Sequence, residues 1–227
     1  MTETMNQIRA VVFDFDGTLV QTRIDFKRMR LAIIQHLENW DLNEEILDRD
    51  AYVLELVAKG RDVLGDTHGR GEAFVQGAMQ IIETIEMETC PHASPFPGVQ
   101  ETLKLLSGMG YGIGIITRNG RKGVEAVTSR CDLCYDVLLT RNDVEQVKPH
   151  PKHLEIALGL LGMPPEQAAM IGDHPTDMVC GKAAGAAAIG VLNNGLTREC
   201  LLSAGADMII RSVPDLLQHL KGFPTRS

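Results

Sequence analysis

A short apolar run near the N-terminus ends abruptly in two acidic residues and a glycine. The run Ala10–Phe13 is followed by Asp14, Phe15, Asp16 and Gly17. Four consecutive apolar residues are typical of a strand that is buried on both faces of a parallel sheet. Because side chains alternate along a strand, Asp14 and Asp16 are expected on one side and Phe15 on the other. Gly17 then allows a sharp turn, so the strand is predicted to deliver two carboxylates to one site.

Two carboxylates in such a place repel each other unless a cation lies between them or one of them holds a proton. Both arrangements are useful in catalysis. A bare acidic pair at a strand end also caps ordinary turns, so the pair alone does not fix a function. The rest of the chain has to decide between these interpretations.

From residue 99 onward the sequence alternates between helix-like and strand-like segments. Strands are expected at 111–116, 137–139, 168–171, 188–192 and 207–210, and helices at 99–108, 122–129, 152–161 and 183–187. Such alternation predicts an α/β fold, a Rossmann-like open, mainly parallel sheet with helices on both faces. Ligands of such sheets bind at the carboxyl ends of the strands.

The segment between the first strand and residue 91 has a different character. Its apolar residues recur at helical spacing in three groups, within 24–37, 46–57 and 74–85, which fits three or four helices. Gly60 and the loop-like stretch 65–71 are predicted to break them. We therefore expect an α/β core formed by residues 1–20 and 92–227, with an inserted all-helical domain at 21–91.

Composition excludes several classes of function. A formal net charge of −8 over 227 residues argues against a nucleic-acid binder that relies on basic character. The chain has no apolar run long enough for a membrane span, and its first ten residues do not resemble a signal peptide. The interpretation at this stage is a cytoplasmic protein with neither nucleic-acid nor membrane partners.

Polar residues follow three of the later strands. Thr117, Arg118 and Asn119 come after the strand at 111–116, Lys148 lies between the strand at 137–139 and the next helix, and residues 172–177 read Gly-Asp-His-Pro-Thr-Asp. Each signal is weak alone. A threonine there is more often a helix cap, a lysine is usually solvated, and a Gly-Asp pair often forms a turn.

Together and in this order, the motifs resemble those of the haloacid dehalogenase superfamily of phosphotransferases. The motifs are D-x-D-G-T at 14–18, Thr117, Lys148 and G-D-x-x-x-D at 172–177. A helical insert between the first and second motifs resembles the phosphoglycolate-phosphatase-like subclass, whose cap lies there. The resemblance thus implies that 1–20 and 92–227 are the catalytic core and that 21–91 is the helical cap domain. The resemblance covers essentially the whole chain.

The resemblance implies catalytic roles for four residues. Asp14 is similar to the family nucleophile, which attacks phosphorus to form an aspartyl-phosphate. Asp16 is similar to the general acid that protonates the leaving group and then activates water. Thr117 and Lys148 would supply hydrogen-bond donors and positive charge to the phosphoryl group.

The resemblance also implies a metal and further binding residues. Mg²⁺ would be held by the Asp14 carboxylate, the Asp16 backbone carbonyl and Asp173, with Asp177 in a supporting role. The remaining phosphate- or substrate-binding candidates are the two residues after Thr117, namely Arg118 and Asn119.

The expected activity is Mg²⁺-dependent hydrolysis of a small phosphorylated metabolite, a phosphomonoester such as phosphoglycolate or a sugar phosphate. A phosphomutase on the same core and a catalytically silent binding or regulatory module stay open as alternatives. A dehalogenase needs neither Mg²⁺ nor the second acid, so Asp16 argues against it. The sequence leaves open the substrate, the oligomeric state and the basic cap residues that contact substrate.

Overall fold

The computed structural model describes residues 7–42, 51–65, 67–193 and 195–220. The chain divides into two compact units. The first, named here the sheet unit, consists of Met1–Thr22 and His92–Ser227, and the second, the helical unit, is Arg23–Pro91. The short helix η3 (Cys90–His92) spans the second boundary in the sequence.

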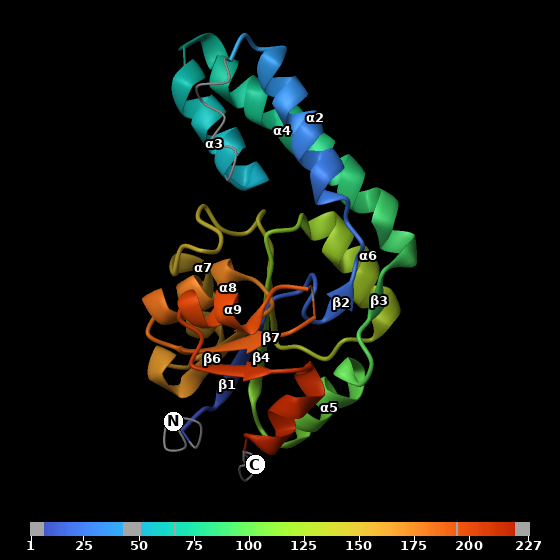
Figure 1. The fold of residues 1–227 in the computed structure, drawn as a ribbon, viewed down its shortest axis with the longest axis vertical. Helices are drawn as coiled ribbons and strands as arrows, with labels where there is room; N and C mark the ends of the chain where they lie inside the picture. The colour runs from blue at the N-terminus through green and yellow to red at the C-terminus, as the bar shows by residue number, and fades with distance from the viewer. Residues whose placement is uncertain (1–6, 43–50, 66, 194, 221–227) are drawn as a thin grey trace. The chain divides into compact units, whose positions relative to one another are not determined.

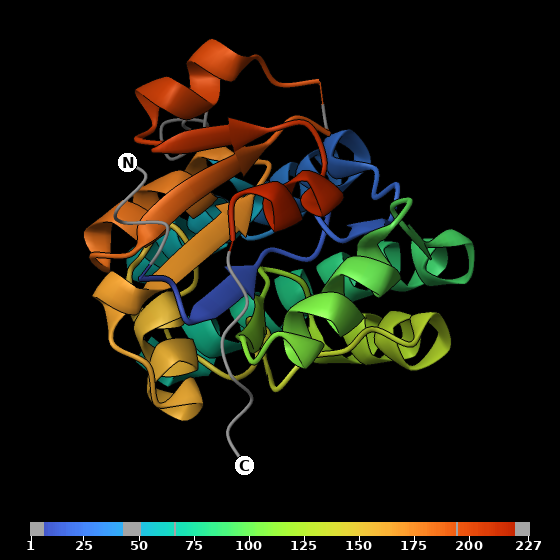
Figure 2. The ribbon, with the colours of Figure 1, turned by 90° about the horizontal axis from the view of Figure 1, so that it is seen from below.

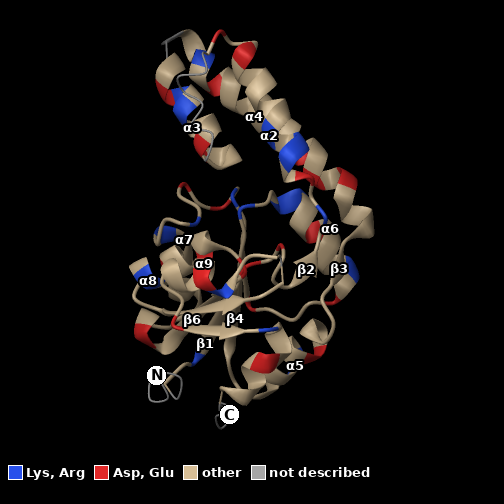
Figure 3. Cartoon of the chain, in the orientation of Figure 1, with Lys and Arg blue, Asp and Glu red and all other residues tan. Residues whose placement is uncertain are grey.

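The sheet unit is built on a six-stranded, fully parallel sheet in the order β5-β4-β1-β6-β7-β8 (Figure 1). The strands are β1 (Ala10–Phe13), β4 (Gly112–Ile116), β5 (Val137–Leu139), β6 (Ala168–Gly172), β7 (Ala187–Val191) and β8 (Met208–Ile210). They carry no charged residue, as the uniform tan of the strands in Figure 3 shows. The predicted α/β fold is thus confirmed, with β1 near the centre of the sheet.

Helices lie on both faces of this sheet (Figure 2). They are α5 (Val99–Gly108), α6 (Arg121–Cys131), α7 (Lys152–Leu161), α8 (Pro175–Ala183) and α9 (Arg198–Ser203), with the shorter η4 (Pro165–Gln167) and η5 (Val213–Gln218). A separate two-stranded antiparallel sheet joins β2 (Val20–Gln21) to β3 (Ser94–Pro95). The sequence pattern did not indicate this small sheet, because two-residue strands carry no periodicity.

The core on one face of the sheet packs against α7 and α8. Val12 of β1 pairs with Gly114 on one side and Met170 on the other, and all three neighbour the apolar face of a helix. A Cβ on Gly114 would lie 3.2 Å from Val12 and 3.5 Å from Leu161 of α7, so the glycine allows a close helix–sheet approach. Burying one such aliphatic side chain contributes about 1.5–3 kcal/mol.

The expected helix at 183–187 is wrong. The helix α8 lies earlier, at Pro175–Ala183, and Ala187 already belongs to β7. Proline at the first helical position and a reciprocal cap between His174 and Asp177 start the helix. Gly185, with φ of 84°, then turns the chain toward the next strand.

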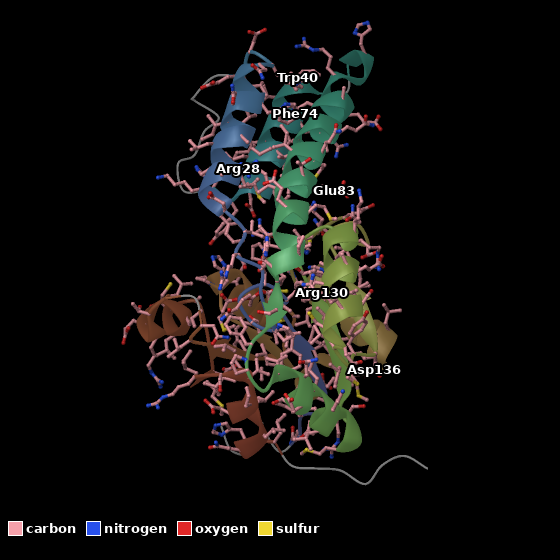
Figure 4. The ribbon with its side chains drawn as sticks, turned by 90° about the vertical axis from the view of Figure 1, so that its right-hand side faces the viewer. Arg28, Trp40, Phe74, Glu83, Arg130 and Asp136 are labelled. Atoms are coloured by element: carbon pink, nitrogen blue, oxygen red, sulfur yellow. The ribbon has the colours of Figure 1, made fainter. Side chains whose placement is uncertain are left out.

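The described residues of the helical unit form three α-helices, and the sequence predicted three or four. They are α2 (Phe26–Glu38), α3 (Val53–Leu64) and α4 (Arg70–Thr89), with the short η2 (Thr67–Gly69) before α4. Leu37, Leu56 and Phe74 are fully buried between them. Trp40 packs edge-on against the Phe74 ring at 5.9 Å between centroids (Figure 4). Ile46, which begins the second predicted apolar group, lies outside the described residues. None of the described helices is both long and apolar enough to cross a membrane.

The predicted helix break at Gly60 is also wrong, because α3 continues through this residue. A Cβ on Gly60 would lie 2.6 Å from the Phe74 ring and 2.8 Å from Leu37. The glycine therefore serves the contact of α3 with α2 and α4 and is not a break. The break that the sequence placed at 65–71 is confirmed, since α3 ends at Leu64 and α4 begins at Arg70.

We expect the same substitution to have opposite effects at two helical glycines. Gly60→Ala should destabilise the helical unit by about 1–3 kcal/mol, because the new methyl group overpacks the Phe74 contact. Gly159→Ala in α7 should stabilise the sheet unit by up to about 1 kcal/mol, since no atom lies within 4 Å of its Cβ position. Urea unfolding followed by circular dichroism would measure both, and the fluorescence of the single tryptophan, Trp40, would report on the helical unit. Destabilisation by both variants would contradict the packing argument.

Candidate active site

Asp14 directly follows the central strand of the sheet. Its backbone N–H donates to the carbonyl of Ile171 at 2.8 Å, which extends the pairing of β1 with β6. Gly17 then adopts φ of 82° and donates to the carbonyl of Val20 at 2.9 Å. The chain therefore turns where the sequence pattern predicts, and Asp14 lies at the carboxyl edge of the sheet.

Lys148 joins two of the acidic residues. Its Nζ lies 2.5 Å from Asp14 Oδ1 and 2.7 Å from Asp177 Oδ1. Only 2% of the lysine is exposed. The structure thus brings together the first, third and fourth motifs, although they are far apart in the sequence.

Asp173 completes a buried cluster of three carboxylates. One carboxylate oxygen from each of Asp14, Asp173 and Asp177 lies within 4.8 Å of the others. The hydroxyl of Thr18 donates to Asp173 Oδ1 at 3.0 Å. Three carboxylates face one ammonium group, so the buried cluster has an excess of negative charge. Such an excess demands protons or a further cation.

The electrostatics reflect this excess. Burial raises the pKa of Asp14 and of Asp173, and neighbouring carboxylates raise each further, while Lys148 opposes the shift. Burial alone would lower the pKa of Lys148, but the charges of Asp14 and Asp177 raise it above its ordinary value. An isolated ion pair would lower the pKa of its acid. In Asp14 the desolvation of the carboxylate outweighs the attraction of the lysine.

The donor set suits a hard divalent cation. Carboxylate oxygens are the ligands that Mg²⁺ prefers, and a bound cation would balance the buried negative charge. Asp177 is the least suited of the three, because Lys148 donates to its Oδ1 and the His174 backbone N–H to its Oδ2 at 3.0 Å. A cation at this cluster therefore fits Asp14 and Asp173 better, with Asp177 orienting the lysine.

Asp16 is held by two side chains from different loops. The hydroxyl of Thr22 donates to its Oδ1, and the Asn119 amide donates to its Oδ2 at 3.1 Å. The structure therefore places the Asn119 amide against the second acid of the first motif. Thr22 carried no signal in the sequence, because a lone threonine in a polar segment is common.

Thr117 follows β4 and is fully buried. Its Oγ1 accepts a bond from the Asn119 backbone N–H at 3.1 Å, so its own hydrogen can still be donated to a ligand. Arg118 is half-buried, and its carbonyl oxygen accepts from the Arg141 guanidinium at 3.1 Å. The loop after β4 is thus anchored to the loop after β5.

His153 in α7 is a further residue that the sequence did not indicate. Its ring lies between the Lys148 backbone and the Leu139 carbonyl and has no exposed surface. Burial lowers its pKa to about 3, and the charge of Lys148 adds to this effect. The available signal was a histidine next to the apolar face of a predicted helix, which is also typical of an ordinary core residue. Thr18 was visible only as part of the first motif.

Comparisons with known proteins agree on one family. The sequence model described as haloacid dehalogenase-like hydrolase matches residues 11–191. A curated protein named pyrophosphatase PpaX, from Bacillus mycoides (strain KBAB4), is 31% identical, and the match covers 94% of this chain and 97% of the relative.

Solved structures show the same fold. A hydrolase from Pseudomonas syringae matches with a TM-score of 0.67 at 24% identity, covering 92% of this chain and 96% of that one. A predicted phosphoglycolate phosphatase from Haemophilus somnus 129pt matches with a TM-score of 0.67 at 22% identity, covering 94% and 98%. At these identities the likeness concerns the fold.

Acid should destabilise the protein partly through His153. Its pKa is about 3 in the folded chain and ordinarily 6.5, so between these values the unfolded chain binds a proton that the native state excludes. The resulting loss of unfolding free energy is roughly 2 kcal/mol from about pH 7.5 to about pH 5. His153→Leu lacks this titration. On going from about pH 7.5 to about pH 5, the unfolding free energy of the parent should therefore fall by that amount relative to the variant in urea unfolding, so that the difference between the two proteins changes with pH. A difference that stays constant across the range would contradict the neutral buried ring.

Proposed function

Since the chain belongs to the haloacid dehalogenase-like hydrolase family, we propose that this phosphatase is Mg²⁺-dependent and acts through an aspartyl-phosphate. The observation that carries the proposal is the buried arrangement in which Lys148 bridges Asp14 and Asp177 beside Asp173. A reactive carboxylate, a fixed positive charge and an oxygen-rich cation site then lie at one strand edge. These are the groups that phosphoryl transfer requires.

Asp14 is the proposed nucleophile. Its carboxylate oxygen attacks phosphorus, the bond from phosphorus to the leaving oxygen breaks, and the phosphoryl group is then carried by Asp14. Water subsequently attacks phosphorus and releases inorganic phosphate with the free carboxylate. The contact with Lys148 favours the ionised, reactive form of the carboxylate, against the burial that opposes it.

Asp16 is the proposed general acid and base. It gives its proton to the departing oxygen in the first step and takes a proton from water in the second. Its bonds from Thr22 and Asn119 support this role, because a proton-transfer group has to be held in a defined orientation.

The phosphoryl oxygens are proposed to bind Thr117 and Lys148, with Arg118 and Asn119 nearby in the same loop. Mg²⁺ would be held by Asp14, the Asp16 carbonyl and Asp173, and when bound it supplies positive charge to the phosphoryl group. Asp177 orients Lys148 through the contact at 2.7 Å. Donors fixed before the reaction stabilise charge without having to reorganise.

The proposed substrate is a small phosphorylated compound, with inorganic pyrophosphate first and phosphomonoesters such as phosphoglycolate or sugar phosphates next. Pyrophosphate is favoured by the relative's name, since that protein is called a pyrophosphatase and matches nearly its whole length. We propose that the helical unit acts as a cap that selects among these substrates. A phosphomutase would instead return the phosphoryl group of Asp14 to a second substrate hydroxyl.

The purified protein with Mg²⁺ should release phosphate from pyrophosphate or from a phosphomonoester in a panel of metabolites, and excess chelator should abolish this release. Asp173→Ala should lose turnover while its circular dichroism stays that of the parent, because the cation loses a carboxylate. Undiminished release in chelator, or by Asp173→Ala, would contradict the metal site. Conversion of a sugar phosphate to its isomer, dependent on a bisphosphate primer, would instead indicate a mutase.

The two aspartates of the first motif should fail in different ways. Asp14→Asn removes the anionic nucleophile, so turnover should fall to background. Asp16→Asn leaves the nucleophile in place and should slow turnover by about 10²- to 10⁴-fold. With an aryl phosphate, whose leaving group needs little protonation, Asp16→Asn should accumulate the phosphorylated protein.

Acid quenching and peptide mapping by mass spectrometry would locate that phosphate. It should be found on the peptide with Asp14 in the Asp16→Asn protein and be missing from the Asp14→Asn protein. Phosphate on a serine, threonine or histidine, or full turnover by Asp14→Asn, would rule out this mechanism.

A further inference from the structure

A buried imidazole lies directly behind the site. His153 Nδ1 is 3.4 Å from the Lys148 backbone nitrogen, and its Nε2 is 3.3 Å from the carbonyl oxygen of Leu139. A backbone N–H can only donate, so Nδ1 acts as an acceptor. Nε2 then carries the ring hydrogen and donates it to Leu139. The two contacts thus select one neutral tautomer of the ring.

The Leu139 carbonyl has a second donor. The backbone N–H of Thr117 donates to the same oxygen at 3.0 Å. A carbonyl oxygen has two lone pairs and can accept both bonds. The imidazole and this carbonyl therefore connect the backbone of Lys148 to the backbone of Thr117.

We propose that His153 is a positioning residue that sets the place of Lys148 relative to Thr117. The catalytic part of this inference rests on the proposed function, which assigns both side chains to the phosphoryl oxygens. His153 lies outside all four motifs.

The surroundings of Lys148 explain why such a tether matters. The lysine lies in the connection between β5, which ends at Leu139, and α7, which begins at Lys152. At the start of α7 the His150 ring accepts from the Lys152 N–H at 3.1 Å, whereas the N–H of Lys148 itself donates to His153. The tether fixes the loop backbone at the residue whose ammonium contacts Asp14. A shift of about 1 Å in such a group can cost about 10²-fold in rate.

The charge state of the ring supports the same role. Burial, together with the charges of Lys148 and Arg118, lowers the pKa of His153 to about 3, against the opposing effects of the Leu139 carbonyl and Asp143. The ring therefore keeps one acceptor and one donor at neutral pH. A protonated ring would have two donors and would lose the bond from the Lys148 backbone.

The decisive comparison is between His153→Leu and His153→Gln. Leucine fills the buried space without hydrogen bonds, whereas glutamine offers an acceptor and a donor on one planar group. Two control variants are matched to them. His150→Leu removes an exposed histidine whose Nδ1 accepts from the Lys152 N–H, so it deletes a neighbouring loop bond while leaving the one from Lys148 to His153. Leu154→Val trims the buried residue next to His153 on α7.

Four quantities would be measured, well below the melting temperature of each protein. They are kcat and KM for the Mg²⁺-dependent hydrolysis of an aryl phosphate, the Kd for inorganic phosphate, and the free energy of unfolding. His153→Leu should lose about tenfold or more in kcat/KM and bind phosphate more weakly, and His153→Gln should recover most of both. The two controls should stay within about twofold of the parent.

The inference would be overturned if His153→Leu kept both quantities, or if Leu154→Val lost as much at equal stability. Nitrogen-15 NMR of the parent protein tests the premise without any variant, which covers the case of a leucine variant that fails to fold. The ring signals of His153 should show a hydrogen on Nε2 and none on Nδ1 at neutral pH. A charged ring, or the other tautomer, would contradict the tether. Phosphate binding and NMR need no turnover, so a failure of the proposed function is distinguishable from a failure of this inference.

Discussion

One buried ammonium group holds the carboxylates of the site together. Lys148 contacts Asp14 and Asp177, and these three groups are withdrawn from water. Without the lysine the two acids and Asp173 would form a cluster of buried negative charge, and removing one partner of a buried ion pair typically costs about 3–5 kcal/mol. The lysine is therefore as important for the integrity of this edge of the sheet as for any role in chemistry. The residues that position it also determine the geometry of the acids.

The sheet explains why groups so distant in the sequence meet. The strand β1 lies between β4 and β6, and the later strands are added outward from it on both sides of the sheet. Asp14, Thr117 and Asp173 follow these three neighbouring strands, so their side chains share one edge. The order of strands, more than any local preference, gathers the motifs. Gly172 adds a local requirement, since a Cβ there would lie 2.1 Å from the carboxylate of Asp177.

The apolar runs of the sequence were sufficient to predict the parallel strands, and the motifs indicated which residue types follow them at the carboxyl edge of the sheet. Continuous apolar runs mark fully buried parallel strands, which is why 10–13 was predicted to the residue. The helix at 183–187 failed because small residues fit both a tightly packed helix and a buried strand. The capping signal at Pro175 and Asp177 was interpreted as a turn or as part of a motif, and the helix was placed too late in the sequence. The prediction at Gly60 was wrong for a related reason. In the sequence, a glycine where two helices cross cannot be told from a helix breaker, because its contact with Phe74 is visible only in the structure.

The sequence did not predict which contact each residue of a motif makes. Thr117 and Asn119 were both assigned to phosphate, but the Asn119 N–H donates to the Thr117 hydroxyl and its amide to Asp16. The turn that this backbone bond stabilises aims the amide at the first motif. Such a contact depends on torsion angles in two loops, and residue types alone do not specify them. The same holds for His153. The sequence shows that it lies five residues after Lys148, but its bond to the β5 carbonyl depends on how α7 packs on the sheet. Motifs therefore name the reacting groups, whereas the residues that orient them emerge only from the packing of the loops.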